Sequence, residues 1–536
     1  MTEETDNLGE FNPLDMSNYR VEKLPKTEKT GFEKFLVYLG GPLALLAFVL
    51  LYWFVKIPFL ENIDTATLTK EAGVRLKELG LVDFTRINYA MLAIFAAAII
   101  LWITEAVPNY LTSLILIIVM VLTQVTTDKV AYAQLGHPVM WLNILAFILA
   151  SMLVKTQVAK RFALWFVVRF GKNSSWVIFS FIVINVVLSA FISATTAKAT
   201  ILLPIFMVIA AIYGARGGDN RNNFGRNLVL QNLFQINIGA SGFITGSGAN
   251  LLAGALIAGA MGMEIFSYQD WFITAFPLSI IIILIGWFVG TKIIFPLKPQ
   301  ERLPQIEGGI RYLKDELAKM GKMKPIEYRA IAIFLVVLAL WATDKQHGIE
   351  QTAVAFLGAV VALLPGIGIV KWNDVDIPWH LMLFSAGAYT LGAGLDATGL
   401  PGTVVNATFD AMGVSAQTPF WVLYMFLTAL MLFSALIFQS KTMRALIFVP
   451  ISIGVAQKFG YPIMSLSFPV ALLIEHVYVM PFNSKPAALL YTTNQYSYID
   501  TIKYGMVMML ISWGMIMVWG ETVMRWLGHT PNGVFF

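Results

Sequence analysis

Two basic residues stand inside a long apolar segment of this chain. The stretch LIFQSKTMRALIFVPI contains Lys441 and Arg444. An unpaired cation is costly to bury in such a setting, so these residues usually line a cavity or pair with another charge. An earlier stretch repeats the pattern, because ATTAKATILLPI (194–205) aligns without gaps on SKTMRALIFVPI (440–451) and places Lys198 at the position of Arg444. The pattern indicates a binding site for a small anion, and snorkelling of Lys198 and Arg444 towards lipid headgroups or the domain interface is the alternative.

Hydroxyl groups accompany these cations at the midpoints of two apolar stretches, 176–213 and 418–457, each too long for a single span. A chain that turns back inside a membrane needs polar groups at its turn, and hydroxyls donate hydrogen bonds to carboxylates. We therefore expect two re-entrant hairpins whose tips bind the anion. The hydroxyl-bearing residues at the tips are Thr195, Thr196, Ser440 and Thr442.

Each hairpin is followed by an apolar span with a polar interruption. The first interruption reads GASGFITGSGAN (239–250), and the second reads MPFNSKPA (480–487), where we expect Pro481 and Pro486 to break the helix. Broken helices present free N–H groups and positive dipole ends, which suit carboxylates near the membrane midplane. Lys485 lies in the second interruption, and we expect it to act as a further cation of the site.

The remaining ionisable residues give little support to other chemistry. Glu475 and His476 could relay a proton, but we expect Glu475 to be a counter-charge to the basic residues. The five histidines are scattered, and the sequence contains no cysteine, no HExxH motif and no P-loop. We therefore expect no metal, no cofactor and no coupling to ATP, and we find no nucleophile–base pair for an intramembrane enzyme.

The composition is that of an integral membrane protein. Of the 536 residues, 57% are hydrophobic and 13% are charged, and the mean hydropathy is +0.71. The net charge of +5 comes mostly from basic loops, so we expect contact with the lipid bilayer and none with nucleic acid. Apolar windows predict an all-α polytopic membrane protein with about 11 transmembrane helices plus the two re-entrant hairpins. The predicted spans are 36–56, 87–107, 110–127, 139–154, 227–259, 271–295, 327–345, 351–369, 381–395, 464–496 and 502–524.

The distribution of Lys and Arg predicts the orientation in the cell membrane. Connections 155–172, 214–226 and 297–325 are basic and belong in the cytoplasm, whereas 260–270 and 396–417 contain no Lys or Arg and belong outside. This alternation places the N-terminus in the cytoplasm and the C-terminus outside. The predicted parts are a cytoplasmic N-terminal segment 1–35, a first transmembrane helix with an external linker 36–86, a first repeat 87–296, a cytoplasmic linker 297–325 and a second repeat 326–536.

The two repeats are visible as internal similarity. INYAMLAIFAAAIILWITE (87–105) aligns on IEYRAIAIFLVVLALWATD (326–344), and HPVMWLNILAF (137–147) corresponds to IPWHLMLFSAG (377–387). Five spans and one hairpin per half give an odd number of crossings, so the halves should have opposite orientations. Such an inverted repeat is typical of secondary transporters. An anion channel or an intramembrane enzyme could share the hydrophobicity, but neither needs this symmetry.

Over roughly residues 87–525 the chain resembles the divalent anion/sodium symporter (DASS) family. The resemblance rests on both hairpins, both interruptions, WITEAVP (102–108) and the HPVMW motif. In that family, Ser-Asn-Thr motifs at two hairpin tips bind a di- or tricarboxylate, and loops in two broken spans complete the site. The resemblance implies the family's fold, a homodimer and an elevator-type movement. With the residues noted above, it places substrate binding at Thr195, Thr196, Thr245, Gly246, Ser247, Asn250, Ser440, Lys441, Thr442, Asn483, Ser484 and Pro486. From their own charge, not from the resemblance, we expect Lys198, Lys441, Arg444 and Lys485 to compensate the charge of the substrate.

The tips depart from the family's motif, because they read Ala194-Thr195-Thr196 and Ser440-Lys441-Thr442 without the central Asn. If fixed cations stand where sodium would bind, the empty carrier keeps an unpaired charge and crosses slowly. We therefore expect sodium-independent exchange of di- or tricarboxylates of the succinate, malate, 2-oxoglutarate and citrate class. A sodium- or proton-coupled symporter is the alternative, and an anion channel is the alternative from another class.

Overall fold

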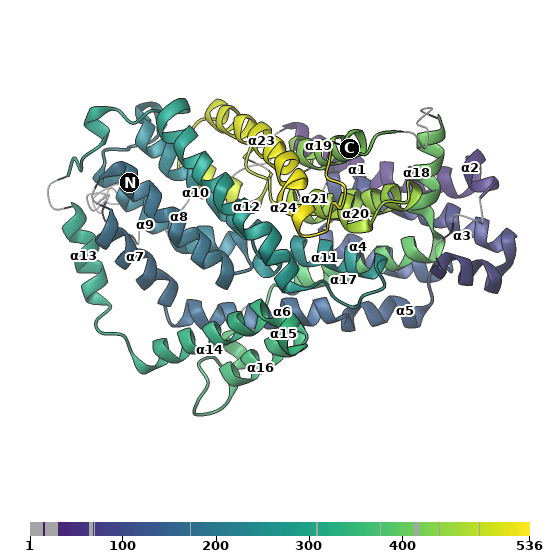
Figure 1. The fold of residues 1–536 in the computed structure, drawn as a ribbon, viewed down its shortest axis with the longest axis horizontal. Helices are drawn as coiled ribbons and strands as arrows, with labels where there is room; N and C mark the ends of the chain where they lie inside the picture. The colour runs from purple at the N-terminus through teal and green to yellow at the C-terminus, as the bar shows by residue number, and fades with distance from the viewer. Residues whose placement is uncertain are drawn as a thin grey trace, which may run out of the picture.

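The computed structural model describes residues 14, 16 and 31–535, except 64–67, 69, 105, 172, 307–308, 376, 412–417, 439 and 482. The described residues form helices and connections without a strand. Most of the predicted N-terminal segment 1–35 and the tip residue Gln439 lie outside these residues. The protein is therefore an all-α protein, as predicted, and its helices lie side by side in an elongated body (Figure 1).

The chain enters through α1 (Gly31–Val49) and then builds two series of helices in the same order. The first series is α3 (Lys70–Thr104), α4 (Asn109–Leu122), α6 (Pro138–Lys155), α7 (Val158–Phe170), α8 (Ser174–Phe191), α9 (Thr195–Ile212), α10 (Asn223–Ser241), α11 (Gly248–Ala260) and α12 (Tyr268–Phe288). The second series is α14 (Pro325–Ala342), α16 (Gln351–Leu363), α17 (Trp379–Thr398), α18 (Leu400–Ala411), α19 (Phe420–Phe433), α20 (Lys441–Lys458), α21 (Ile463–Leu472), α22 (Lys485–Tyr491) and α23 (Tyr498–Glu521). Short helices α2 (Pro58–Glu61), α5 (Asp128–Ala133), α13 (Gly309–Lys319), α15 (Asp344–His347) and α24 (Val523–Trp526) complete the fold.

The contacts between the two series are reciprocal. Helix α4 packs against α17 and its counterpart α16 packs against α6, while α11 packs against α20 and its counterpart α22 packs against α9. When a helix of one series packs against a helix of the other, and the repeat copies of these two helices also pack against each other, the two contacts are related by a two-fold axis. The packing therefore agrees with the two-fold repeat read from the sequence, and the opposite orientation of the halves stays a prediction.

Seven helical segments of the described residues are long and apolar enough to cross a membrane, judged by length and hydropathy. Several other predicted spans correspond to shorter apolar helices, among them α4, α11, α16 and α21. The two stretches predicted to be hairpins contain the helix pairs α8–α9 and α19–α20. The number of eleven spans and the return of both hairpins to the side they enter remain predictions.

The predicted linkers contain helices that the hydropathy pattern did not indicate. Within the expected external linker, α3 begins at Lys70 and is kinked at Gly80, whose φ of 76° is readily adopted by glycine. Within the expected cytoplasmic linker, α13 is held beside α7 by Arg161. The guanidinium of Arg161 lies 2.6 Å from Glu327 and donates to the carbonyl oxygens of Met320 and Gly321.

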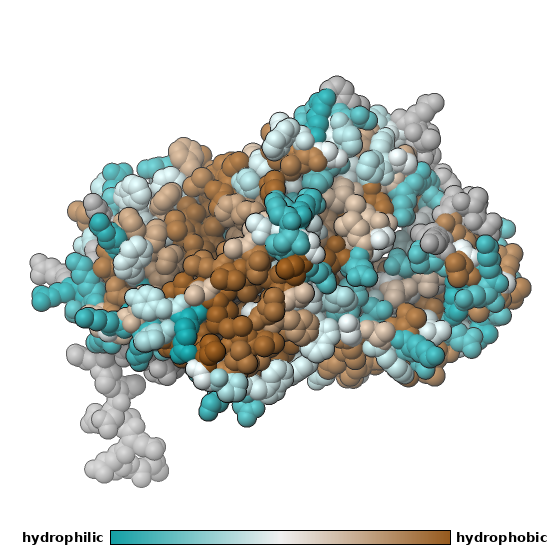
Figure 2. All heavy atoms as spheres, turned by 60° about the horizontal axis from the view of Figure 1, so that its bottom comes forward, coloured by the Kyte–Doolittle hydropathy of each residue, from teal (hydrophilic) through white to brown (hydrophobic). Residues whose placement is uncertain are grey.

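The surface carries broad apolar areas. Figure 2 turns the lower edge of Figure 1, where α14 and α16 lie, towards the viewer, and hydrophobic residues cover much of the middle of this face with hydrophilic residues around them. Exposed side chains of these two helices include Leu335, Val336, Leu357 and Val360. Contiguous apolar areas of this kind are expected where helices face lipid.

Candidate functional site

The two hairpin tips are short, and most of their predicted residues lie in the first turn of the second helix. Helix α8 ends at Phe191 and α9 begins at Thr195, so only 192–194 are non-helical in the first hairpin. In the second hairpin α20 begins at Lys441, with Ser440 as its N-cap. The first-turn N–H groups of a helix are free to bind an anion, so this arrangement suits the predicted role of the tips.

The two interrupted spans have matching breaks. Helix α11 is capped by Ser247 at φ −158° and ψ 157°, and α22 is capped by Ser484 at φ −158° and ψ 158°. Each hydroxyl accepts a hydrogen bond from the amide three residues later, in Asn250 at 3.2 Å and in Ala487 at 3.3 Å. Serine is a preferred N-cap because its oxygen satisfies a free N–H group. The repeat is therefore preserved in the backbone at both breaks.

The prediction that prolines cause the second break is wrong. Helix α21 already ends at Leu472, well before Pro481, although Pro469 lies inside it. Pro486 occupies the first turn of α22, where its missing N–H group has no intrahelical partner to lose. The second break is instead a long connection that contains Glu475.

Gly246 and two asparagines fix the shape of the breaks. A Cβ atom on Gly246 would lie 2.2 Å from the carbonyl oxygen of Ala240, so only glycine fits there. Asn250 donates 3.0 Å hydrogen bonds to the carbonyl oxygens of Ala240 and Phe243, at the end of α10. Asn483 accepts from the amide of Met480 at 2.6 Å and donates to the carbonyl of Ala435. These predicted binding residues thus hold the backbone of the breaks.

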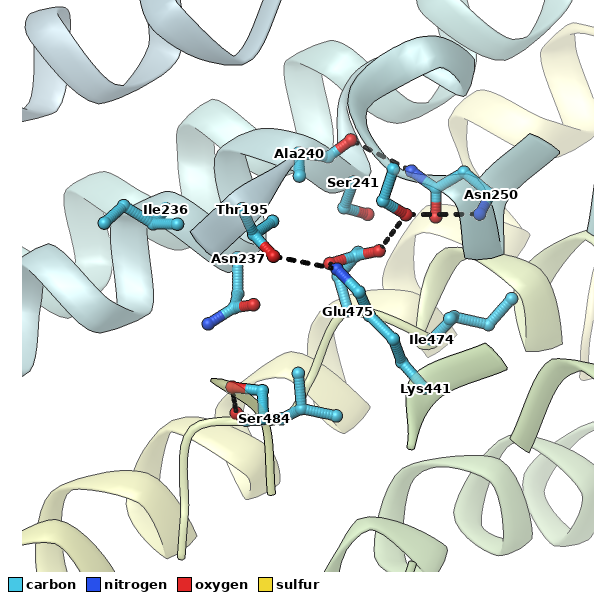
Figure 3. Close-up of polar contacts among 12 residues, drawn as sticks. Thr195, Ile236, Asn237, Ala240, Ser241, Asn250, Lys441, Ile474, Glu475 and Ser484 are labelled. Atoms are coloured by element: carbon cyan, nitrogen blue, oxygen red, sulfur yellow. Dashed lines mark hydrogen bonds and ion pairs between the residues drawn. The ribbon is translucent and has the colours of Figure 1, made fainter. Parts of the chain in front are cut away.

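The tips and breaks of both halves meet at an ion pair, shown in Figure 3. Lys441 Nζ, at the start of α20, lies 2.7 Å from Oε2 of Glu475 in the second break. The same ammonium lies 3.4 Å from the hydroxyl of Thr195 at the start of α9. The other carboxylate oxygen of Glu475 accepts a hydrogen bond from Ser247 in the first break. One lysine and one glutamate therefore connect both tips and both observed breaks.

Lys198 and Arg444 are fully buried, with 0% of each residue exposed, so the alternative of snorkelling to headgroups is wrong. Lys198 donates to the hydroxyl of Ser189 at 2.9 Å and to the carbonyl of Ile236 at 3.3 Å. Arg444 occupies the matching position of α20 and donates to the corresponding parts of its own half. Its acceptors are the hydroxyl of Ser434 and the carbonyl oxygens of Met431, Leu473 and Ile474.

Other predicted site residues lie outside this network. Lys485 is exposed and has no ion pair within the described part of the chain. Thr196 and Thr442 are half-buried beside the tips. Thr245 instead lines a separate small cavity of about 10 Å³ with Ser193 and Trp341.

Two residues take part in the site in ways that the sequence did not predict. Glu475 was expected only as a counter-charge, and its contact with Ser247 joins positions 228 residues apart. Asn237, drawn in Figure 3, is fully buried, and its Oδ1 has no hydrogen-bond partner among the described residues. Asn237 follows Ile236, an acceptor for Lys198, and Glu475 follows Ile474, an acceptor for Arg444. The sequence signal for Glu475 was an acidic residue within an apolar span, and the sequence held no comparable signal for Asn237.

The larger cavities lie elsewhere and are apolar. A groove of about 550 Å³ is lined by residues of α6, α7, α8, α13 and α14, and another of about 390 Å³ lies between α1, α3 and α4. Neither contains a residue of the Lys441–Glu475 network. Since their walls are almost entirely hydrocarbon, they fit the lipid-facing surface better than a polar site. The described residues also contain no group of three or more His, Cys, Asp or Glu that could hold a metal ion.

Comparisons with known proteins agree with this architecture. The chain is 26% identical over 451 residues to the sodium-dependent dicarboxylate transporter SdcS of Staphylococcus saprophyticus, covering 79% of this chain and 85% of the relative. It is 25% identical over 432 residues to the protein of the same name in Staphylococcus aureus strain USA300, covering 77% and 81%. A membrane protein of Cupriavidus necator is 24% identical over 459 residues, covering 82% and 87%. The family model described as sodium:sulfate symporter transmembrane region matches residues 82–530, so the chain belongs to this DASS family of membrane transporters.

Proposed function

We propose that the chain is a secondary transporter of small dicarboxylates such as succinate. The observation that carries the proposal is the meeting of Lys441 and Thr195 at the starts of two long helices. A cation, a hydroxyl and two helix N-termini are complementary to carboxylate groups. The relatives named above as dicarboxylate transporters support the same substrate class.

The coupling mode has two candidates. The names of these relatives favour sodium-coupled symport, and we place that mode first. The expectation of sodium-independent exchange assumed an unpaired cation, whereas Lys441 is paired with Glu475. Exchange stays the second candidate because Lys198 and Arg444 add two buried cations without an ion-pair partner close enough to form a salt bridge in the described chain. Proton-coupled symport through Glu475 and His476 ranks behind both.

The remaining expectations come from the family resemblance and are part of the proposal. They are a homodimer, an elevator-type movement that carries the tips and breaks across the membrane, a cytoplasmic N-terminus and an external C-terminus. Tricarboxylates rank second to dicarboxylates as a substrate class.

Uptake into proteoliposomes tests the function and the coupling together. Labelled succinate is supplied outside vesicles that contain buffer alone or unlabelled succinate, each with and without an inward sodium gradient. Sodium-driven uptake into the buffer-loaded vesicles is the expected result. Uptake that occurs only into succinate-loaded vesicles, and that needs no sodium gradient, would establish exchange. Absence of succinate uptake in all four conditions would refute the proposed function. A Lys441→Ala variant should lose most of the preference for succinate over butyrate, because the fixed cation favours a dianion.

An anion channel is separated from a carrier by current measurements. A channel conducts many ions per opening, so planar bilayers with reconstituted protein would show unitary currents in a dicarboxylate gradient. We expect none, and saturable uptake instead.

A further inference from the structure

Four charged side chains converge where the tips and breaks meet. We call Lys198, Lys441, Arg444 and Glu475 the charge cluster. Lys198 lies one turn after Thr195, whose hydroxyl meets Lys441, and Arg444 donates to the carbonyl oxygen of Ile474, the residue before Glu475. Three members are fully buried, and the side chain of Lys441 is 17% exposed. Because so little water reaches these groups, their charges act strongly on any ion that enters between them.

The formal charges of the cluster do not cancel. Three basic groups and one carboxylate leave an excess of two positive charges. A dianion bound at the cluster would bring the local sum to zero. A trianion would leave one uncompensated negative charge, which is unfavourable where water is scarce. The local charge therefore matches an anion with two carboxylates.

Glu475 is the group that sets this sum. Its carboxylate accepts hydrogen bonds from Lys441 at 2.7 Å and from Ser247, while Lys441 also faces Thr195 at 3.4 Å. An ammonium and hydroxyls are the donors that would hold a carboxylate of the substrate. Glu475 thus supplies a carboxylate of the protein at a position where a third carboxylate of the substrate could otherwise bind.

We propose that Glu475 determines the valence of the transported anion, so that the carrier prefers dicarboxylates over tricarboxylates. This inference rests on the proposed function and makes it more specific. The three cations attract carboxylates, and the fixed carboxylate of Glu475 reduces the number that can be bound to two. Removal of its charge should make room for a third.

The test compares two substrates that differ by one carboxylate. Glutarate and propane-1,2,3-tricarboxylate share a five-carbon chain with terminal carboxylates, and the second carries an additional carboxylate at the middle carbon. Their half-saturation concentrations are measured in counterflow with reconstituted wild-type and Glu475→Gln proteins at a pH where all carboxylates are ionised. Wild type should prefer glutarate, and Glu475→Gln should shift the ratio towards the tricarboxylate at least ten-fold. Glu264→Gln removes an exposed glutamate between α11 and α12 and should leave the ratio unchanged.

A double variant separates charge from shape. Lys441→Met with Glu475→Gln removes one positive and one negative charge, so the excess returns to two. We expect this variant to prefer glutarate again, with weaker affinity because the Lys441 donor is lost. If the double variant prefers the tricarboxylate as strongly as Glu475→Gln does, the change reflects space rather than charge and the inference is overturned.

A third variant covers the case in which Glu475→Gln is not recovered as folded protein. Asn237→Asp keeps the size of a buried side chain next to Ile236, whose carbonyl binds Lys198, and adds a carboxylate. The variant should raise the half-saturation concentration of glutarate at least ten-fold more than that of the monoanion butyrate. Equal weakening of both would overturn the inference.

These outcomes are distinct from failure of the proposed function. If wild type transports glutarate and Glu475→Gln leaves the ratio unchanged, the carrier is a dicarboxylate transporter whose valence preference has another origin. If wild type transports neither of these anions nor succinate, the proposed function itself is refuted.

Discussion

Replacement of Gly246 by alanine tests whether the first break positions the site. The new Cβ atom would lie 2.2 Å from the carbonyl oxygen of Ala240, whereas ordinary contact begins at 3.4 Å. The backbone would therefore have to move by about 1.2 Å. Ser247 follows directly in the chain and would move with it, which would disturb its hydrogen bond to the carboxylate of Glu475.

Two free-energy terms follow from this displacement. Overpacking of this kind destabilises a protein by about 1–3 kcal/mol. Loss of the hydrogen bond from Ser247 to a charged acceptor removes about 1.5–3 kcal/mol. Since 1.4 kcal/mol corresponds to a factor of ten, we expect the half-saturation concentration for succinate to rise at least ten-fold. The melting temperature should fall by several degrees.

Gly259→Ala is the matched control, because nothing lies within 4 Å of its new Cβ atom. Gly259 belongs to the same helix, α11, where alanine favours the helix by about 1 kcal/mol over glycine. Its melting temperature should therefore stay equal or rise, with transport unchanged. Both variants are compared by thermal unfolding in detergent and by succinate uptake into proteoliposomes. Wild-type affinity and melting temperature in Gly246→Ala would refute the positioning role of the break.

Three further predictions address the hairpins and the linker. Arg444→Met should lower the stability by about 3 kcal/mol or more, because several buried carbonyl oxygens lose their donor. Arg444→Lys should lose less stability than Arg444→Met in thermal unfolding, and a wild-type melting temperature in Arg444→Met would contradict the prediction. Thr196→Val and Thr442→Val should each weaken succinate binding about ten-fold or more, and calorimetry giving wild-type affinity for both would remove them from the site. Arg161→Met should destabilise the protein by about 3–5 kcal/mol because it leaves the buried Glu327 without its partner. Glu327→Gln in the Arg161→Met background should recover stability, and no recovery would argue against the ion pair as the cause.

The sequence was sufficient for features that depend on local pattern. Apolar stretches of about 40 residues were each predicted to turn back at a polar midpoint, and each contains two helices with a break there, while the re-entrant course stays a prediction. The Gly- and Ser-rich segment predicted the break after α10. The repeat placed Lys198 and Arg444 at matching positions, and the structure shows them in matching environments. These signals survive because hydropathy and cap residues act over a few turns of one helix.

The sequence was a poorer guide to features that depend on contacts between residues far apart in the chain. No local pattern distinguishes snorkelling from burial for Lys198, because the difference depends on whether α10 supplies an acceptor. The end of α21 at Leu472 was missed because Pro481 and Pro486 gave a stronger local signal than the connection that precedes them. The position of Glu475 between Lys441 and Ser247 required segments from both halves to be packed together.

The matching backbone angles of Ser247 and Ser484 carry a consequence for how a substrate would lie between them. The main chain offers the two ends of a symmetric molecule almost the same surroundings, but the side chains do not. Gly248 follows the first serine, whereas Lys485 follows the second, and Glu475 in the second break has no acidic counterpart in the first. A molecule with two unlike ends, such as malate or 2-oxoglutarate, would therefore distinguish the two sides and bind in one preferred direction, while succinate could bind either way round.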